Sequence, residues 1–267
     1  MNRQPSSFFD NLPDIQKRLS EKEIVFFLDY DGTLTPIVAT PDLAVLSEDM
    51  RQTLRELIKR YKVSIVSGRA TDDVKGKVKL DGIFYAGSHG FEIVYPSGEV
   101  KINEQAQKIR SVIDEAHAKL EKRLAGIKGA LAEHVKYTIS AHYRLVADTD
   151  FPQFEKIVDE TVREYPSLRK SSGKKVFELK PKIDWHKGKA VEWILKVIGT
   201  GENILPIYIG DDTTDEDAFR VLRDKGFGIL VADPVRASVA EYVIKNAEEV
   251  KKVLKFFIGL KSTDDHR

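Results

Sequence analysis

The sequence predicts an α/β protein, a doubly wound and mainly parallel sheet with helices on both faces, into which a second, smaller α/β unit is inserted. Short apolar runs rich in β-branched and aromatic residues recur along the chain, as expected of strands buried on both faces. Amphipathic stretches with helical spacing lie between several of these runs. A change to one-sided strands in the middle of the chain predicts the insert.

The larger unit should alternate strands and helices. Ser47 is the expected N-cap of its first helix, because a hydroxyl there can accept a hydrogen bond from an early backbone N–H. Thr213 and Glu216 have the spacing of a capping box before a later helix. The expected strands lie at residues 24–28, 63–66, 83–86, 207–209 and 227–231. The expected helices lie at residues 47–61, 191–198, 213–222 and 251–260.

The middle of the chain has a different pattern. Apolar residues at helical spacing predict helices at residues 109–120 and 154–165. Alternation over residues 137–144 predicts a strand with one wet face, and a further strand is expected at residues 174–180. We therefore expect a smaller α/β unit at residues 103–182. The larger domain around it would consist of residues 1–102 and 183–267.

Composition bounds the class of protein. A chain of 267 residues with 42% hydrophobic and 32% charged side chains fits a globular protein of one to two domains. A formal net charge of +1 offers no bulk field for nucleic acid or an anionic membrane, so neither is expected as a partner. The absence of cysteine excludes disulfides, thiolate metal sites and a cysteine nucleophile. With no signal-like or membrane-spanning apolar run, we expect a cytoplasmic protein.

Two carboxylates follow the first predicted strand. Asp29 and Asp31 are separated by one residue and followed by Gly32, at the carboxyl end of a strand, where parallel sheets bind ligands. This spacing can place one carboxylate in line with an electrophile and the other beside its leaving group. One is then a nucleophile, and its partner transfers a proton. An acidic turn or a calcium loop is the alternative for this motif alone.

Two further motifs have the chemistry of phosphate binding. Ser67 and Arg69 flank a glycine after the strand at residues 63–66, where a hydroxyl and backbone N–H groups suit phosphate oxygens, and we expect Arg69 to contact substrate. Lys187 begins a predicted helix, where an ammonium and the helix N-terminus can hold an anion together. A simple turn and a common helix start are the alternatives. His89, in a glycine-flanked loop, is expected to be a turn histidine bonded to backbone, with orientation of a site loop as its alternative.

Acidic residues also gather after the strand at residues 207–209. Asp211 and Asp212 follow it directly, and carboxylate oxygens suit a hard cation such as Mg²⁺, which keeps several waters and also contacts substrate phosphate. Helix capping explains Thr213 and Glu216 equally well, but it does not explain the pair of aspartates. We therefore expect a magnesium site here.

The four motifs occur in one order, each after a predicted strand or at a helix start. In this order they resemble the haloacid dehalogenase (HAD) superfamily of phosphohydrolases. The long interval between Ser67 and Lys187 matches the place where that superfamily can insert a cap domain, so residues 103–182 are called the cap and the rest of the chain the core. The resemblance implies that Ser67 and Lys187 are catalytic and cradle the transferring phosphoryl group.

The same resemblance implies a covalent mechanism. Asp29 would attack phosphorus, and Asp31 would protonate the leaving oxygen and then deprotonate the attacking water. Mg²⁺ would be held by Asp29, by Asp31 through its backbone carbonyl, and by Asp211, with Asp212 steering metal-bound water.

A narrower set of motifs resembles the trehalose-6-phosphate phosphatase family, over about residues 24–243. The resemblance implies hydrolysis of trehalose 6-phosphate to trehalose and phosphate. The chain departs from the family pattern at Val135, where many members carry lysine, and has Lys136 next. The motifs are Ala86–Glu92, His142–Arg144, Phe177–Pro181, Trp185–Gly188 and Gly210–Phe219. The cap residues that the resemblance places on the disaccharide are Glu133, Arg144, Lys174 and Glu178.

Two alternatives stay open. Another capped HAD sugar phosphatase, acting for example on sucrose phosphate, would share the core motifs and differ only in the cap. A non-catalytic sugar-phosphate-binding regulator could keep the fold, although intact Asp29, Asp31, Lys187 and Asp211 speak against it. The expected partner is a small-molecule sugar phosphate, and we expect a monomer.

Overall fold

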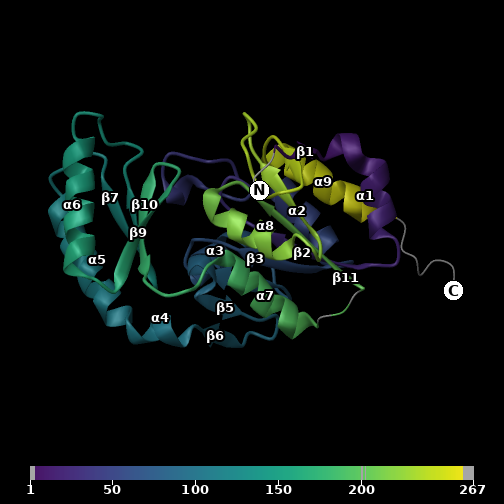
Figure 1. Cartoon of the computed structure of the whole chain (residues 1–267), viewed down its shortest axis with the longest axis horizontal. Helices are drawn as coiled ribbons and strands as arrows, with labels where there is room; N and C mark the ends of the chain where they lie inside the picture. Colours follow the sequence, from purple (N-terminus) through teal and green to yellow (C-terminus); the bar gives the residue numbers. More distant parts are fainter. Residues whose placement is uncertain (1–3, 200, 202, 261–267) are drawn as a thin grey trace.

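The structure is a computed structural model that describes residues 4–199, 201 and 203–260. Within these residues, thirteen strands form two sheets (Figure 1). In spatial order the large sheet contains β1 (Ser6–Ser7), β13 (Tyr242–Ile244), β12 (Phe227–Val231), β11 (Ile204–Gly210), β2 (Glu23–Leu28), β3 (Lys62–Val66), β4 (Phe84–Gly87), β5 (Glu92–Val94) and β6 (Val100–Ile102).

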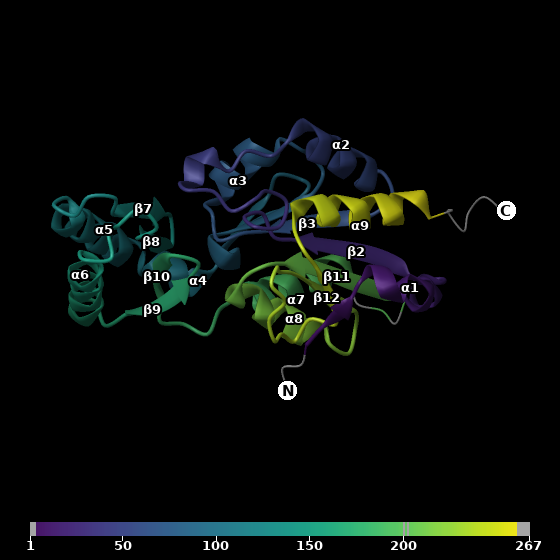
Figure 2. The same ribbon diagram turned by 90° about the horizontal axis from the view of Figure 1, so that it is seen from above.

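The large sheet is parallel from β1 to β4, as expected for strands buried on both faces. Only β5 and β6 run antiparallel, as a hairpin at one edge. Two hydrophobic clusters cover the two faces, and Figure 2 shows helices on both sides of the sheet. One face is covered by α1 (Leu12–Leu19), α2 (Glu48–Leu57), α3 (Thr71–Val78) and α9 (Ala247–Gly259). The other is covered by α7 (Lys187–Ile198) and α8 (Glu216–Leu222).

The cap contains the small sheet and its own hydrophobic cluster. Its strands, all antiparallel, are β7 (Leu131–Val135), β8 (Thr138–His142), β10 (Val176–Pro181) and β9 (Leu168–Gly173) in spatial order. Its helices are α4 (Glu104–Lys108), α5 (Arg110–Leu124) and α6 (Phe151–Glu164). Phe177 and Leu179 pack into the cluster with α5 and α6, so the alternate residues of β10 point to the other face of the sheet.

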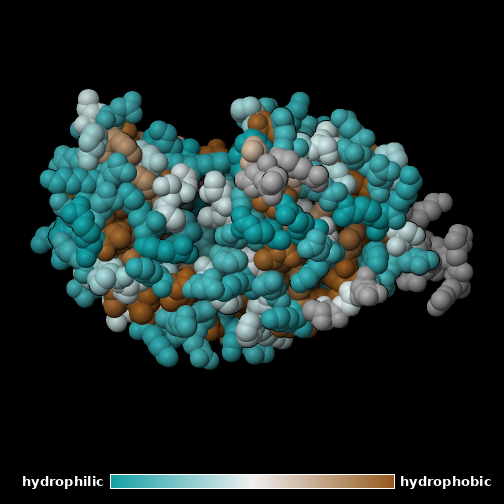
Figure 3. Space-filling view, in the orientation of Figure 1, coloured by the Kyte–Doolittle hydropathy of each residue, from teal (hydrophilic) through white to brown (hydrophobic). Residues whose placement is uncertain are grey.

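The two sheets face each other across a notch, visible between the two lobes in Figure 3. The carboxyl ends of β2, β3 and β11 and the polar face of the small sheet open onto it. Short 3-10 turns complete this edge, among them η2 (Pro41–Leu43), η3 (Ser88–Gly90) and η4 (Thr213–Asp215). No helix in the described part of the chain has the length and apolar character needed to cross a bilayer.

Two local predictions were wrong. The strand expected at residues 174–180 begins at Val176, because Lys174 and Lys175 form the turn between β9 and β10, with Lys175 in the left-handed region at φ 65°. The capping box after β11 is formed by Asp212 and Asp215 rather than by Thr213 and Glu216. Ser47 is the N-cap of α2, as expected, and accepts from the backbone N–H of Met50.

Candidate active site

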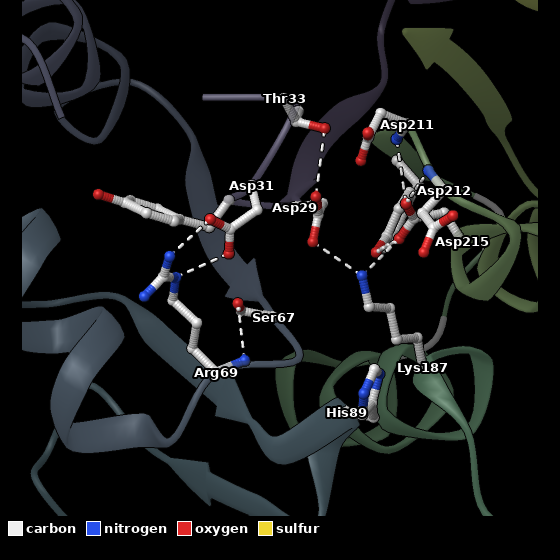
Figure 4. A network of polar contacts seen from close by, with 12 residues as sticks. Asp29, Asp31, Thr33, Ser67, Arg69, His89, Lys187, Asp211, Asp212 and Asp215 are labelled. Atoms are coloured by element: carbon white, nitrogen blue, oxygen red, sulfur yellow. Dashed lines mark hydrogen bonds and ion pairs between the residues drawn. The ribbon is translucent and has the colours of Figure 1, made fainter. Parts of the chain in front are cut away.

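The floor of the notch is a buried lysine between two carboxylates (Figure 4). Asp29 directly follows β2, and Lys187 is the first residue of α7. The Nζ of Lys187 lies 2.7 Å from Asp29 Oδ1 and 2.7 Å from Asp215 Oδ1. All three side chains are almost fully buried. Because β2 and β11 are neighbouring parallel strands, their carboxyl ends bring Asp29 and Asp211 together although the two residues are far apart in sequence.

These buried carboxylates differ in how easily they ionise. Burial raises the pKa of Asp29 well above its ordinary value, even though the charge of Lys187 opposes the change. Burial likewise raises the pKa of Asp211 to about 6, against the charge of Lys174. Burial acts in the same direction on Asp215, but the charge of Lys187 and the hydrogen bonds from Lys187, Tyr208 and the Asp212 backbone together outweigh it and lower that pKa. The site therefore stabilises Asp215 as an anion and leaves Asp29 and Asp211 in need of further positive charge.

A cation fits the gap between these carboxylates. One carboxylate oxygen from each of Asp29, Asp211 and Asp215 lies within 4.8 Å of the other two, and oxygen donors of this kind suit Mg²⁺. Asp215 is already engaged, because it accepts from Lys187, from the Tyr208 hydroxyl, and from two backbone N–H groups. Asp29 and Asp211 are therefore the carboxylates best placed to bind the ion.

Asp215 was not singled out as a site residue by the sequence. It lies 0% exposed under the turn after β11 and accepts from the backbone N–H groups of Asp211 and Asp212 at 3.0 and 2.9 Å. It thus orients the loop that carries Asp211. Asp212 is half-buried and lines the notch, but it is not in the close carboxylate group. Residues 211–216, after β11, contain four acids, Asp211, Asp212, Asp215 and Glu216, but their spacing does not indicate which side chain turns inward.

Close approach explains why Gly32 follows the first two aspartates. Its φ is +79°, and a Cβ at this position would lie 2.1 Å from Asp211 Oδ2. Any side chain at residue 32 would push Asp211 away from Asp29. The glycine therefore lets the chain turn and lets the two acidic strand ends approach each other.

Asp31 is held by Arg69. The Nε and one terminal nitrogen of Arg69 each lie 2.7 Å from one oxygen of Asp31, and the other terminal nitrogen lies 2.8 Å from Asp73. The guanidinium also donates to the carbonyl of Pro41 at 2.8 Å. This planar fork fixes the Asp31 carboxylate, whose side chain is 45% exposed at the notch. Ser67 is fully buried beneath and accepts from the Arg69 backbone N–H at 3.1 Å.

The cap contributes charged side chains to the same notch. The lining includes Asp29, Asp31, Arg69, Glu133, Arg144, Lys174, Glu178, Lys187, Asp211 and Asp212. All the residues expected from the sequence to act on substrate or metal are thus brought together, except that Ser67 lies below the surface. Lys174, at the tip of the β9–β10 hairpin, forms an ion pair with Asp211. Arg144 donates to the backbone carbonyl of Lys174 at 2.7 Å and so supports this tip.

Two histidines extend the site. His142 Nε2 lies 2.9 Å from Glu133 Oε2 on the neighbouring strand. His89 was expected to bond to backbone, but its ring Nε2 lies 2.6 Å from Glu178 Oε1 of the cap, and that prediction was wrong. No local sequence signal could have paired these residues, because the contact exists only where cap and core meet.

Lys136 does not take the place of the lysine that many family members carry at the position of Val135. Val135 lines the notch, whereas Lys136, in the left-handed region at φ 53°, points to the core. Its Nζ lies 2.9 Å from Glu92 and 2.6 Å from Asp72. Lys136 therefore joins the cap to the core instead of facing the notch.

Comparisons with known proteins agree on one family. A family model described as trehalose-phosphatase matches residues 27–246. Over 262 residues the chain is 42% identical to "Probable trehalose-phosphate phosphatase 3" of Oryza sativa subsp. japonica, with 91% of this chain and 72% of that protein covered. Over 250 residues it is 43% identical to "Trehalose 6-phosphate phosphatase RA3" of Zea mays, with 88% and 69% covered.

Solved structures have the same fold. A trehalose-6-phosphate phosphatase related protein superposes with a TM-score of 0.78 at 25% identity, covering 88% of this chain and 96% of that one. The C-terminal domain of trehalose-6-phosphate phosphatase from C. albicans gives a TM-score of 0.82 at 22% identity, covering 97% and 99%. A haloacid dehalogenase-like hydrolase from Bacteroides thetaiotaomicron gives 0.60 at 18% identity, covering 88% and 100%. The architecture is therefore that of a capped HAD-like hydrolase.

Proposed function

This chain belongs to the trehalose-phosphatase family and is a phosphatase, and from this premise we propose that it hydrolyses trehalose 6-phosphate to trehalose and phosphate with Mg²⁺. One observation carries the proposal. Asp29 follows β2 beside Lys187 and faces Asp211 across a gap that suits a cation, so a nucleophile and its charge partners meet at one point.

The reaction begins with attack by a carboxylate oxygen of Asp29 on phosphorus. An O–P bond forms to Asp29, and the bond from phosphorus to the sugar oxygen breaks. Asp31 gives its proton to the departing oxygen and, as the conjugate base, takes a proton from the water that then hydrolyses the aspartyl phosphate. Both steps need Asp31 at the notch, where its carboxylate is exposed and held by Arg69.

Charge explains the rest of the core site. Mg²⁺, held by Asp29, the backbone carbonyl of Asp31 and Asp211, would reduce the repulsion between an anionic nucleophile and a phosphate dianion. Lys187 keeps Asp29 in place at 2.7 Å and adds positive charge where the phosphoryl group transfers. Ser67 supports the Arg69 loop from below, and direct contact of Ser67 and Arg69 with phosphate stays a prediction. Steering of a metal-bound water by Asp212 also stays a prediction.

Recognition of the sugar is assigned to the cap. Glu133, Arg144, Lys174 and Glu178 line the notch opposite Asp29 and would bind hydroxyl groups of the disaccharide. The hydrophobic cluster of the small sheet, whose buried members other than Phe91 all lie between Ala106 and Leu179, supports the division into a core and a cap at residues 103–182. A cytoplasmic location and a monomeric state stay predictions.

Phosphate release from a panel of sugar phosphates tests this function. With Mg²⁺, trehalose 6-phosphate should be hydrolysed with a higher kcat/KM than sucrose phosphate or glucose 6-phosphate, and Arg144→Ala should reduce this preference. Equal kcat/KM values for all substrates would support a general capped sugar phosphatase instead. No release from any of them would leave only a binding role and overturn the proposal.

A further inference from the structure

We propose that His89 of the core is a positioning residue that holds the cap carboxylate Glu178 in its sugar-binding orientation, so that recognition of the disaccharide is complete only when the cap lies on the core. This inference rests on the proposed function. It assigns a task to a histidine that lines the notch and pairs with Glu178 of the cap.

The carboxylate of Glu178 has one polar partner in the core and one in the cap. Its Oε1 lies 2.6 Å from His89 Nε2, and its Oε2 lies 2.6 Å from Lys180 Nζ on the same cap strand. The side chains of His89 and Glu178 are 6% and 12% exposed. A nearly buried carboxylate takes the orientation that its partners dictate, because an unpaired oxygen there is costly. The cap alone supplies only one of these two partners.

The loop that carries His89 is built to keep it in place. Ser88 and His89 both adopt left-handed conformations, at φ 48° and 58°, which are unfavourable for residues with side chains. Their backbone N–H groups donate to the carbonyls of Arg69 and Ser67 at 2.6 and 2.9 Å. The loop after β3, which carries the Ser67 and Arg69 motif, therefore fixes the conformation of the histidine loop.

The same loop makes a second contact with the cap. The hydroxyl of Ser88 donates to the carbonyl of Val135 at 2.8 Å, at the end of β7. Ser88 therefore contacts β7 while the next residue, His89, contacts β10. Two successive residues thus dock the two cap strands that carry Glu133 and Glu178, which places the histidine loop under the sugar-binding face of the cap.

Gly68 gives independent support. A Cβ at this position would lie 3.0 Å from His89 Cε1, 3.1 Å from its Nε2 and 3.6 Å from Glu178 Oε1. A side chain at residue 68 would therefore press on the histidine ring and would also contact the carboxylate. The glycine of the Ser-Gly-Arg motif therefore does more than let the chain turn, because it leaves room for the pair of His89 and Glu178.

The charges agree with the geometry. Burial lowers the pKa of His89 against the charge of Glu178, and the ammonium groups of Lys180 and Lys187 add to this lowering, so the ring is neutral at neutral pH and Nε2–H donates. Burial alone would raise the pKa of Glu178, but His89 and Lys180 hold it below its ordinary value. A neutral donor therefore faces an ionised acceptor, and the carboxylate keeps the charge with which it binds hydroxyl groups.

The test compares two substrates in three variants of the full chain. Trehalose 6-phosphate needs the cap contacts, whereas para-nitrophenyl phosphate carries no sugar. His89→Leu should lower the ratio of kcat/KM for the first substrate to that for the second about tenfold, mainly through KM, because a buried acceptor loses its donor. His89→Gln, which keeps a donor, should recover most of the ratio. His117→Leu is the control, since His117 bonds inside the cap to the carbonyl of Ala132.

A double-mutant cycle separates positioning from a general loss of stability. If His89 acts through Glu178, His89→Leu should change the ratio little in a Glu178→Gln background. Effects that multiply in the double variant, or an unchanged ratio in His89→Leu, would overturn the inference. Should His89→Leu not fold, Gly68→Ala replaces it and should lower the same ratio. If the wild type released no phosphate from trehalose 6-phosphate, the proposed function would fail as well, which is a distinguishable result.

Discussion

The ammonium of Lys174 lies against the carboxylate of Asp211, so the tip of the cap hairpin reaches the core residue that is expected to hold the cation. Asp211 is 4% exposed in this pair and Lys174 is 44% exposed. A divalent ion that binds Asp211 has to compete with this ammonium for the same oxygen. Metal binding and the position of the cap hairpin are therefore coupled through two side chains.

Removing the competing charge should tighten metal binding. For Lys174→Met we expect the Kd for Mg²⁺ without substrate to fall about two- to fivefold, the range expected for a partly exposed ion pair. Isothermal titration calorimetry measures this directly. Lys175→Met is the matched control, because Lys175 belongs to the same turn but its ammonium lies over the Tyr143 ring. A Kd for Lys174→Met equal to that of the wild type would contradict competition at Asp211.

Loss of Asp31 should reduce turnover without preventing folding. We expect kcat of Asp31→Asn to fall on the order of 10²- to 10⁴-fold, because proton transfer to the leaving oxygen is lost. Asp73→Asn is the control, since Asp73 pairs with the same Arg69 but belongs to α3. Steady-state phosphate release compares the two. Equal losses in both variants would show that Asp31 matters only as a partner of Arg69.

Lys187 should be needed for stability as well as for catalysis. Lys187→Met leaves Asp29 and Asp215 buried without their shared cation, and breaking a buried pair of this kind costs about 3–5 kcal/mol. Urea unfolding of the metal-free protein gives the loss. Lys189→Met, which breaks an exposed pair with Asp184, should cost at most about 1 kcal/mol. Similar losses in both variants would argue against the buried network.

The contribution of Glu178 to stability should depend on pH. His89 and Lys180 hold its pKa below the ordinary value of 4.5 against the effect of burial. A carboxylate with a depressed pKa in the folded state stabilises the fold above its unfolded pKa, and this contribution is lost as pH falls toward the folded pKa. The difference in unfolding free energy between wild type and Glu178→Gln should therefore be larger at pH 7 than at pH 3. The exposed Glu121→Gln should show no such trend, and a constant difference for Glu178→Gln would contradict the pairing.

The core site was predictable because its positions follow from strand ends. Asp29 and Asp211 each follow an apolar run, and parallel strands bring such ends to one edge of the sheet. That the cap residues Glu133 and Glu178 lie at this edge was predicted only from the family resemblance. Alternation predicts which face of its own strand each residue occupies, but not that the two strands lie over the core site.

The remaining features depend on contacts that local patterns do not contain. Gly173 precedes the turn at Lys174 and Lys175, but neither lysine is a usual turn residue, so the predicted alternation of β10 extended one pair too far. The pairing of His89 with Glu178 depends on how the cap docks. The edge hairpin β5–β6 was not predicted, although the sequence has turn residues at Pro96, Ser97 and Gly98, and Gly98 adopts φ +89° there.

The central claim is that Asp29 becomes phosphorylated, and trapping the intermediate tests it most directly. Asp31→Asn, in which hydrolysis of the acyl phosphate should be slow, would be mixed with Mg²⁺ and para-nitrophenyl phosphate, whose leaving group departs without protonation, then quenched in acid and digested for mass spectrometry. The account predicts a phosphoryl group on the peptide that contains Asp29, located on that residue and absent when Asp29 is replaced by Asn. A phosphoryl group on another residue, or undiminished phosphate release by Asp29→Asn, would contradict it.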